Sequence, residues 1–137
     1  MLRLTQRALA FAQRALSMNK YRNKKTQVGD MTFDSQAEAN RYQELVYLSL
    51  AGEIKGWSLQ EETIVPMRQA RQQRIPLVVN GQLVTTYVAD FVYKTKDEHI
   101  VVEDYKGFKT EAYRLKAKLF AAVMGFPITE ISRRRSA

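Results

Sequence analysis

The sequence predicts an α/β domain with a mixed central β-sheet flanked by α-helices. Three observations support this class: helical periodicity near residues 36–51 and 110–124, apolar strand-like runs between them, and a two-residue Asn80-Gly81 turn signal. The expected order is α-β-β-β-α-β, with three or four mostly antiparallel strands between the helices. With 137 residues, the chain is long enough for one domain with a single core.

The first predicted helix runs from Gln36 to Ala51. Asp34 or Ser35 can cap its start, and Gly52 ends it. The side chains expected to face the core recur at helical spacing and are Tyr42, Leu45, Val46 and Ser49.

The middle of the chain is expected to form the sheet. Residues 67–76 contain several arginines among glutamines and predict a basic loop or an irregular sheet edge. Asn80-Gly81 predicts a hairpin turn, because both residues accept the positive φ that such a turn requires. The expected strands are residues 57–65, 82–93, 99–105 and, after the second helix, 127–131.

The second predicted helix begins at a Thr110 cap and continues through Met124 to Gly125. Its expected core stripe consists of Ala112, Leu115, Leu119 and Val123.

The amino-acid composition limits the kinds of metal site and partner that the chain can have. The absence of cysteine excludes disulfides and thiolate zinc sites, and a single histidine, His99, disfavours a histidine-rich metal site. A catalytic metal would therefore need oxygen ligands, which favours Mg²⁺ or Mn²⁺. The net charge of +8 suits DNA or RNA, although a merely cationic soluble protein is the alternative. No apolar stretch approaches the roughly 20 residues that span a bilayer, so no membrane partner is expected.

The ends of the chain are basic. Residues 1–17 contain arginines and no acid, and are interpreted as a peripheral extension to a domain at 18–131. The alternatives are an amphipathic helix, an organelle transit peptide, or a start upstream of Met18. Lys24 and Lys25, in a basic segment, are candidate DNA contacts, or else part of a solvated linker. Residues 132–137 form a basic tail.

The candidate chemistry centres on Asp104-Tyr105-Lys106, which ends an apolar strand-like run. Side chains alternate faces along a strand, so Asp104 and Lys106 share the face of Val102. In the preceding strand Asp90 shares the expected buried face of Val84, Val88 and Val92. An ionised carboxylate in such a row is costly without a partner, and a metal ion or Lys106 would offset that cost.

Pairing between these strands depends on the turn that joins them. A turn of four residues would place Asp90 opposite Glu103. A turn that is one residue longer, or a β-bulge, would place Asp90 opposite Asp104. Asp104 is preferred because its face matches that of Lys106, and Glu103 is the second choice.

Further residues are candidates around this pair. Glu38 lies in line with the core-facing side of the first helix and is expected to join the metal site. The alternative is a capping box with Ser35. The Tyr105 backbone carbonyl is a candidate ligand. Gln60 and Lys116 are candidate contacts to phosphate or metal-bound water, or else an exposed strand residue and a surface lysine.

This order of Glu, Asp and Asp-x-Lys resembles the PD-(D/E)XK nuclease superfamily. Residues 20–25, 33–39, 89–91 and 102–107 also resemble a small phage and prophage family within it, described as Holliday-junction-resolvase-like. The resemblance covers about Met18 to Ile131, and Ala89 stands where the superfamily name has proline. It implies a restriction-endonuclease-like core, with Asp90 and Asp104 as metal ligands, Lys106 as the catalytic lysine and Glu38 as the helical acid.

The expected function is therefore Mg²⁺- or Mn²⁺-dependent hydrolysis of DNA phosphodiesters, at branched or junction DNA. The alternative is a non-catalytic nucleic-acid-binding module or a basic assembly protein with the same fold. A cytoplasmic location in a bacterial host and a homodimer are further expectations from the resemblance.

Overall fold

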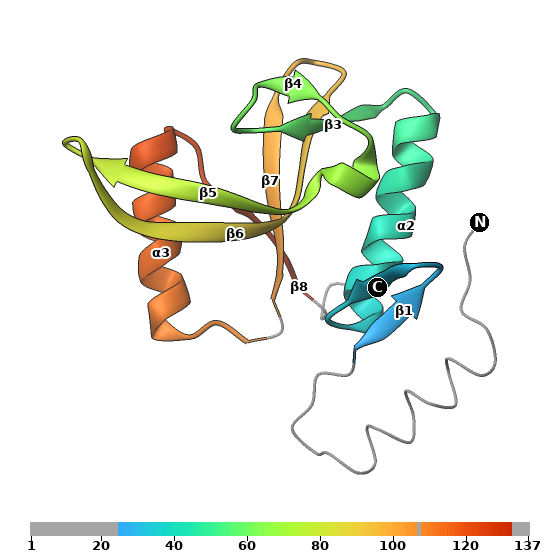
Figure 1. Cartoon of the computed structure of the whole chain (residues 1–137), viewed down its shortest axis with the longest axis horizontal. Coiled ribbons are helices and arrows are strands. Elements are labelled where there is room, and N and C mark those ends of the chain that lie inside the picture. Colours follow the sequence, from blue (N-terminus) through green and yellow to red (C-terminus); the bar gives the residue numbers. More distant parts are fainter. Residues whose placement is uncertain (1–24, 107, 133–137) are drawn as a thin grey trace, which may run out of the picture. The chain divides into compact units, whose positions relative to one another are not determined.

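The computed structural model describes residues 25–106 and 108–132 (Figure 1). The chain divides into two compact units between Tyr47 and Leu48. In the described part, no helix has both the length and the apolar character needed to cross a membrane. Residues 1–17, Lys24 and the tail after Ser132 lie outside the described residues.

The first unit contains an unpredicted hairpin and all but the last turn of a predicted helix. Strands β1 (Thr26–Val28) and β2 (Met31–Phe33) pair antiparallel before α2 (Gln36–Leu50). Ser35 caps α2, since its hydroxyl oxygen accepts the Glu38 N–H at 3.1 Å. Tyr42 and Leu45 are buried as predicted, whereas Val46 and Ser49 are only partly buried.

The second unit is built on a mixed sheet with the strand order β4-β3-β6-β7-β8, to which β5 adds by pairing with β6. All of its neighbouring strands are antiparallel except β7 and β8, which are parallel. The predicted α/β class with a mixed sheet is therefore confirmed. The strands are β3 (Ile54–Ser58), β4 (Thr63–Ile64), β5 (Arg71–Val79), β6 (Gln82–Thr95), β7 (Ile100–Lys106) and β8 (Thr129–Ser132).

The region before β5 differs from the prediction. Residues 57–65 form the end of β3, a turn and β4, so the single strand predicted there is wrong. Gly56 explains the tight packing of this hairpin, because a Cβ on it would lie 2.3 Å from the Val65 carbonyl oxygen. Residues 67–76 form a 3₁₀ turn, Met67–Gln69, and most of β5. The predicted basic loop is therefore wrong, whereas the alternative of an irregular sheet edge agrees with β5, which lies off the main strand order, pairs with β6 and has a positive φ at Gln72.

The turn that joins β5 to β6 is the predicted one. Val79 pairs with Gln82, and Asn80 and Gly81 have φ angles of 49° and 78°. These values suit a type I′ turn, which confirms the Asn80-Gly81 prediction. Val84 has no partner opposite it, because the register shifts between Leu77 and Val78, and it is therefore the extra residue of a β-bulge.

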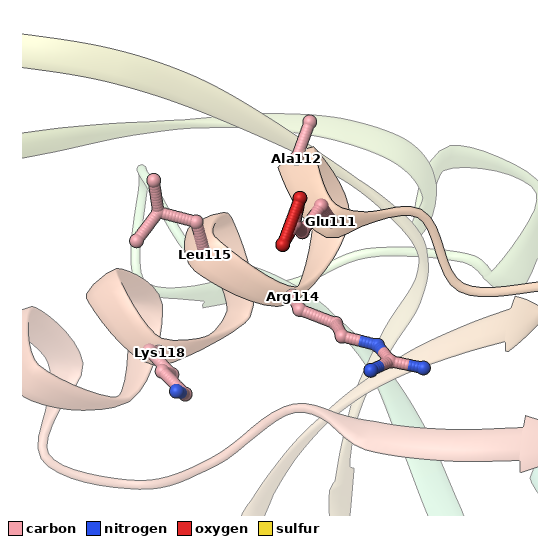
Figure 2. Close-up of a pocket in the computed structure, with 5 residues that line it drawn as sticks. All are labelled: Glu111, Ala112, Arg114, Leu115 and Lys118. Carbon is pink, nitrogen blue, oxygen red and sulfur yellow. The ribbon is translucent and has the colours of Figure 1, made fainter.

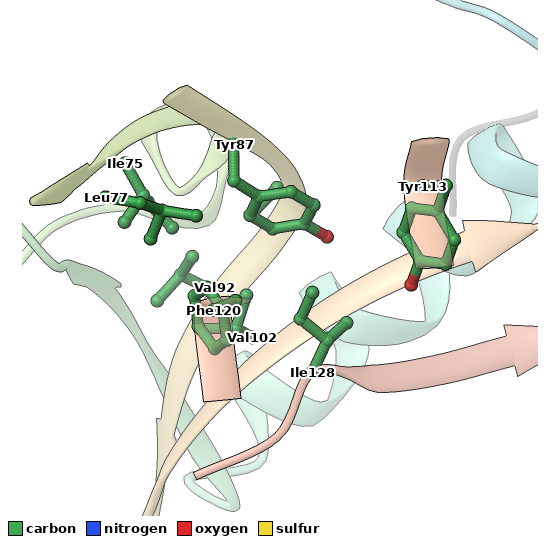
Figure 3. Close-up of a cluster of buried hydrophobic side chains, with 9 residues drawn as sticks. Ile75, Leu77, Tyr87, Val92, Val102, Tyr113, Phe120 and Ile128 are labelled. Carbon is green, nitrogen blue, oxygen red and sulfur yellow. The ribbon is translucent and has the colours of Figure 1, made fainter. Parts of the chain in front are cut away.

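Helix α3 (Glu111–Met124) packs on the sheet, and its ends are those predicted. The Thr110 hydroxyl oxygen accepts the Tyr113 N–H at 3.0 Å, and Gly125 is left-handed with φ of 86°. The core between α3 and the sheet (Figure 3) consists of Ile75, Leu77, Tyr87, Ala89, Val92, Val102, Tyr113, Phe120 and Ile128.

The predicted core stripe of this helix is wrong in its first half. Leu115 is 70% exposed and Ala112 is exposed, whereas Leu119 and Val123 are partly buried and pack against the core as predicted. Tyr113 and Phe120 are the buried residues. Two faces of α3 have apolar residues at helical spacing, so hydropathy alone does not show which face is buried. Tyr113 faces inward because its hydroxyl finds an acidic partner at the sheet, as described below.

The buried row expected on β6 is correct only at its end. Val92 is buried as expected, but Val84 and Val88 are 56% and 40% exposed, and Tyr87, Ala89 and Phe91 are buried as well. The cause is a change of partners along the strand: the first part of β6 pairs with β5 alone, and its last part lies between β3 and β7. Where it has two neighbours, β6 is covered on both faces.

Candidate active site

Two aspartates lie level with each other on neighbouring strands. Phe91 pairs with Glu103 in the β6–β7 register, and one step further along this register Asp90 lies beside Asp104. The ladder ends here, and the Asp90 carboxylate accepts the Tyr105 N–H at 2.7 Å. That hydrogen bond holds the Asp90 side chain against β7.

Asp104 is a buried carboxylate with partners on both oxygens. It is 3% exposed, and the Tyr87 hydroxyl donates a hydrogen bond to Oδ2 while Lys106 Nζ lies 3.5 Å from Oδ1. Burial raises the pKa of Tyr87 well above its usual value, and the negative charge of Asp104 raises it further. Tyr87 therefore keeps its proton at neutral pH and acts as a permanent donor to Asp104.

Lys106 lies between an acid and an aromatic ring. Its Nζ is 4.4 Å from the centroid of the Tyr113 ring, in addition to its contact with Asp104. The cation–π contact and the ion pair restrict a side chain that is otherwise flexible. The side chain remains 30% exposed, so its ammonium group can still meet a ligand from solvent.

A third carboxylate, Glu130, stands beside Asp104 in the parallel β7–β8 register. It accepts hydrogen bonds from Lys109 Nζ at 2.7 Å and from the Tyr113 hydroxyl at 2.9 Å. The bond from Lys109 is the main cause that lowers the pKa of Glu130, against a smaller opposing effect of burial. Burial and the bond to Glu130 raise the pKa of Tyr113. Glu130 therefore extends the network on the β8 side.

Glu103, the second choice for the site, belongs to a separate pair. It is 1% exposed, and the Tyr93 hydroxyl donates to its Oε2 at 2.5 Å. Because successive side chains alternate across a strand, Glu103 faces away from Asp104 and Lys106. The two faces of β7 thus hold two different tyrosine–carboxylate pairs.

The remaining candidates of the second unit lie apart from these contacts. Lys116 Nζ donates to the Thr86 carbonyl oxygen at 3.1 Å, so it ties α3 to β6. Gln60 is an exposed residue of the turn after β3, and its predicted place on a strand is wrong. It shares a shallow hollow with Ser58 and Gln73.

Two candidates belong to the first unit. Glu38 on α2 is 4% exposed, and its N–H bond to Ser35 is the amide half of the predicted capping box. Its expected role beside the aspartates stays a prediction. Lys25 Nζ lies 3.3 Å from Asp34 Oδ1, and both side chains are exposed.

The donor set at Asp90 and Asp104 is compatible with Mg²⁺. Across residues 25–106 and 108–132, no cluster of three or more histidine, cysteine or acidic side chains could hold a metal ion. Mg²⁺, however, commonly binds through one or two carboxylates and completes its shell with water and substrate phosphates. Asp90 and Asp104 supply two such carboxylates from adjacent strands.

Sequence reasoning missed Tyr87, Lys109 and Glu130, and it named Tyr113 only as a possible phosphate contact. No short motif marks these residues, because they come from β6, α3, β8 and the segment between β7 and α3, which only the folded sheet brings together. The sequence signal that was available is the single acid, Glu130, in the predicted final strand, which the observed parallel register places beside Asp104.

The comparisons with known proteins place the chain in a family. A family model described as a protein of unknown function, DUF1064, matches residues 18–131. The chain belongs to the DUF1064 family. No curated protein and no solved structure gave a match. The region matched by DUF1064 contains Asp90, Asp104 and Lys106, together with Glu130.

Proposed function

We propose that this DUF1064 chain is a Mg²⁺- or Mn²⁺-dependent endonuclease that hydrolyses DNA phosphodiesters. The observation that supports the proposal most is the placement of Asp90 level with Asp104, with Lys106 Nζ 3.5 Å from Asp104. The resemblance to the PD-(D/E)XK superfamily and the net charge of +8 support DNA as the substrate. A restriction-endonuclease-like core and a cytoplasmic location in a bacterial host are part of the same proposal.

Asp90 and Asp104 would hold the metal ion in this proposal, with the Tyr105 carbonyl as a further candidate ligand. The role of Glu38 stays the expectation from the resemblance. The bound ion would neutralise phosphate charge and lower the pKa of a coordinated water. Lys106 would stabilise negative charge that develops on the phosphate, since its ammonium group is exposed beside the carboxylates.

The surrounding residues position these groups. Tyr87 holds the Asp104 carboxylate through its hydroxyl, and the Tyr105 N–H holds Asp90. Tyr113 lies against Lys106 on one side and donates to Glu130 on the other. Side chains fixed by such contacts need little reorganisation when a substrate arrives, which is how a preorganised site lowers an activation barrier.

The segment that enters α3 offers contacts for DNA. Phe108 is 79% exposed and stands beside Lys109, two residues after Lys106. Arg114 and Lys118 line a shallow hollow on the outer face of α3, together with Glu111, Ala112 and Leu115 (Figure 2). Basic side chains contact phosphates, and an exposed ring can stack on an unpaired base of branched DNA. Lys24, Lys25 and Lys116 remain candidate contacts from the sequence.

The test is cleavage by two isosteric variants and one matched control. Asp90→Asn and Asp104→Asn should each lower Mg²⁺-dependent cleavage of linear, nicked and four-way DNA at least about 100-fold, while DNA binding stays near wild type. Glu103→Gln changes an acid adjacent to Asp104 on the other face of β7 and should leave cleavage within a few-fold of wild type. Wild-type cleavage by either aspartate variant would overturn the proposal.

A second candidate function is a non-catalytic nucleic-acid-binding module. The observation that favours it is that protein groups already engage both oxygens of Asp104. A titration with Mg²⁺ or Mn²⁺ followed by calorimetry separates the two functions, because the module needs no metal. DNA affinity should fall steeply with salt in both cases, since phosphate contacts release counterions, and a flat salt response would contradict both.

A further inference from the structure

One residue of β5 has a backbone conformation that is unusual inside a strand. Gln72 has a φ angle of 55°, in the left-handed region that residues with a side chain rarely adopt. In the described part of the chain, the other non-glycine residues with a positive φ lie in turns or bends between strands: Glu62, Asn80 and Glu98. Their position in turns explains those three, whereas the conformation of Gln72 has to be explained by the sheet.

Gln72 lies opposite Asp90, one of the two proposed metal ligands. The β5–β6 pairs on either side of Gln72 have the same register, and this register sets Gln72 level with Asp90. On the other edge of β6, Asp90 lies beside Asp104. The irregular residue of β5 is therefore the neighbour of the candidate site on the side away from β7.

The alternation of side chains along β6 is interrupted at the same level. Tyr87 and Ala89 belong to the core cluster under α3, and so does Val92, which a regular strand would place on the opposite face (Figure 3). Val92 pairs with Val102 of β7, another member of that cluster. The change of face therefore lies between Ala89 and Val92, in the segment that contains Asp90.

This interruption gives Asp90 its place beside Asp104. Asp104 shares one face of β7 with Val102 and accepts the hydrogen bond of the Tyr87 hydroxyl. If β6 alternated regularly from Tyr87 onward, Asp90 would lie on the face away from α3. Asp90 instead follows the alternation of Val92, so the two aspartates lie on the same face of the sheet.

The conformation of Gln72 lets β5 stay paired with β6 across the irregularity. Beyond it, Arg71 still pairs with Phe91. The Val92 N–H then donates to the Ala70 carbonyl oxygen at 2.9 Å. Figure 1 shows β6 curving as it passes from β5 to β7. A left-handed residue changes the course of a strand without an inserted residue, so β5 can follow this curve and support it.

The left-handed conformation costs free energy for glutamine, because its Cβ comes close to backbone atoms, and glycine would avoid that cost. Strain of this kind persists only where the surrounding structure fixes it, and it is concentrated at functional sites. We propose that Gln72 is a positioning residue, whose left-handed backbone holds Asp90 beside Asp104. Its effect on metal binding rests on the proposed function, whereas its effect on the place of Asp90 does not.

The test uses two substitutions at Gln72 that differ in the backbone conformation they allow. Glycine accepts a left-handed conformation, whereas valine, which is branched at Cβ, opposes it. Gln72→Gly should therefore keep Asp90 in place, and Gln72→Val should displace it. Glu62→Val is the matched control, because Glu62 has a φ angle of 53° in the turn between β3 and β4, outside the β5–β6 and β6–β7 ladders.

The first readout is hydrogen exchange at the Tyr105 amide, measured by NMR on the full chain without metal. This amide donates to Asp90 Oδ2 at 2.7 Å, so its exchange rate shows whether Asp90 keeps its place. Gln72→Val should exchange at least about tenfold faster than the wild type and than Glu62→Val, which should lose a similar amount of stability. Gln72→Gly should exchange within a few-fold of the wild type.

The second readout is the binding of Mg²⁺ or Mn²⁺, followed by calorimetry. Gln72→Val should raise the ion concentration for half-maximal binding about tenfold or more, because one ligand is misplaced, whereas Gln72→Gly and Glu62→Val should not. A wild-type chain that binds neither ion would contradict the proposed function. The exchange rate of the Tyr105 amide would still decide the role of Gln72.

Wild-type exchange at Tyr105 in a folded Gln72→Val chain would overturn the proposal. Equal rates in Gln72→Val and Glu62→Val would overturn it as well. A Gln72→Gly chain that exchanges as fast as Gln72→Val would also do so, because the side chain and not the backbone would then matter. If Gln72→Val does not fold, Gln72→Ala takes its place, since alanine also disfavours a positive φ but is not branched at Cβ.

Discussion

Removing the tyrosine hydroxyl that donates to Asp104, or the one that donates to Glu103, should show which of these two carboxylates binds the metal ion. Tyr87→Phe deletes the donor to Asp104, and Tyr93→Phe deletes the donor to Glu103. In both variants the ring stays and continues to fill its site. For Tyr87 that site includes Phe120, whose ring centroid is 5.5 Å away.

The expected loss of stability is similar in the two variants. Asp104 and Glu103 are 3% and 1% exposed, so water cannot readily replace the lost donor. A hydrogen bond to a charged group contributes roughly 1.5–3 kcal/mol, and we expect a loss of about 2 kcal/mol in the free energy of unfolding. For a chain of this size that corresponds to a decrease of roughly 8 °C in Tm, measured by calorimetry or circular dichroism.

The expected effect on metal binding differs between the variants. A hydrogen bond that orients a metal ligand typically changes metal affinity about 10–100-fold. Tyr87→Phe should therefore raise the Mg²⁺ concentration for half-maximal binding or cleavage by that factor, whereas Tyr93→Phe should not change it. An equal loss in both variants, or a larger loss in Tyr93→Phe, would refute the assignment of Asp104 as the ligand.

Three further predictions concern stability. Gly56→Ala should lower the free energy of unfolding by at least about 2 kcal/mol in urea, because its Cβ would lie 2.3 Å from the Val65 carbonyl oxygen; an unchanged midpoint would contradict the packing described. Thr110→Ala should cost about 1 kcal/mol, since the first turn of α3 loses its cap, and a neutral result would argue that the cap is unimportant. The pKa of Glu130 is lowered in the folded state, so its stabilisation is present above its unfolded pKa and lost as pH falls through the folded value. Below about pH 4.5 the wild type should therefore lose stability more steeply than Glu130→Gln, and parallel pH curves would contradict this.

Local signals in the sequence were sufficient where a few adjacent residues decide the backbone. The Asn80-Gly81 turn, the Thr110 cap and the end of α3 at Gly125 were predicted correctly. Each depends on φ angles and hydrogen bonds within about four residues. The same locality explains why Ser35 was one of the two residues predicted to cap α2.

The faces of β6 and α3 could not be predicted in the same way. Val88 and Leu115 fit their periodic patterns as well as Tyr87 and Tyr113 do, yet the tyrosines are the buried residues. Their burial depends on acids supplied by β7 and β8, which no pattern within one segment reveals. The choice between two equivalent apolar faces is therefore made by tertiary partners.

The candidate site was anticipated as a set of acids and a lysine, but not as a network. The preference for Asp104 over Glu103 rested on face alternation relative to Lys106, a local property. The tyrosines that hold the carboxylates, and Glu130 beside Asp104, depend on long-range strand pairing. From sequence alone, the pairing of β8 parallel to β7 remains one topology among several.

That parallel pairing has a consequence for synthesis of the protein. A ribosome releases β7 and α3 before β8, so Lys109 and Tyr113 emerge before the acid that both of them bind. The strand beside Asp104 is added only when residues 129–132 leave the exit tunnel. A nonsense mutation ahead of Thr129 would yield a chain without β8. Its sheet would still contain the β5–β6 hairpin, Asp90 and Asp104, but β7 would then be an edge strand.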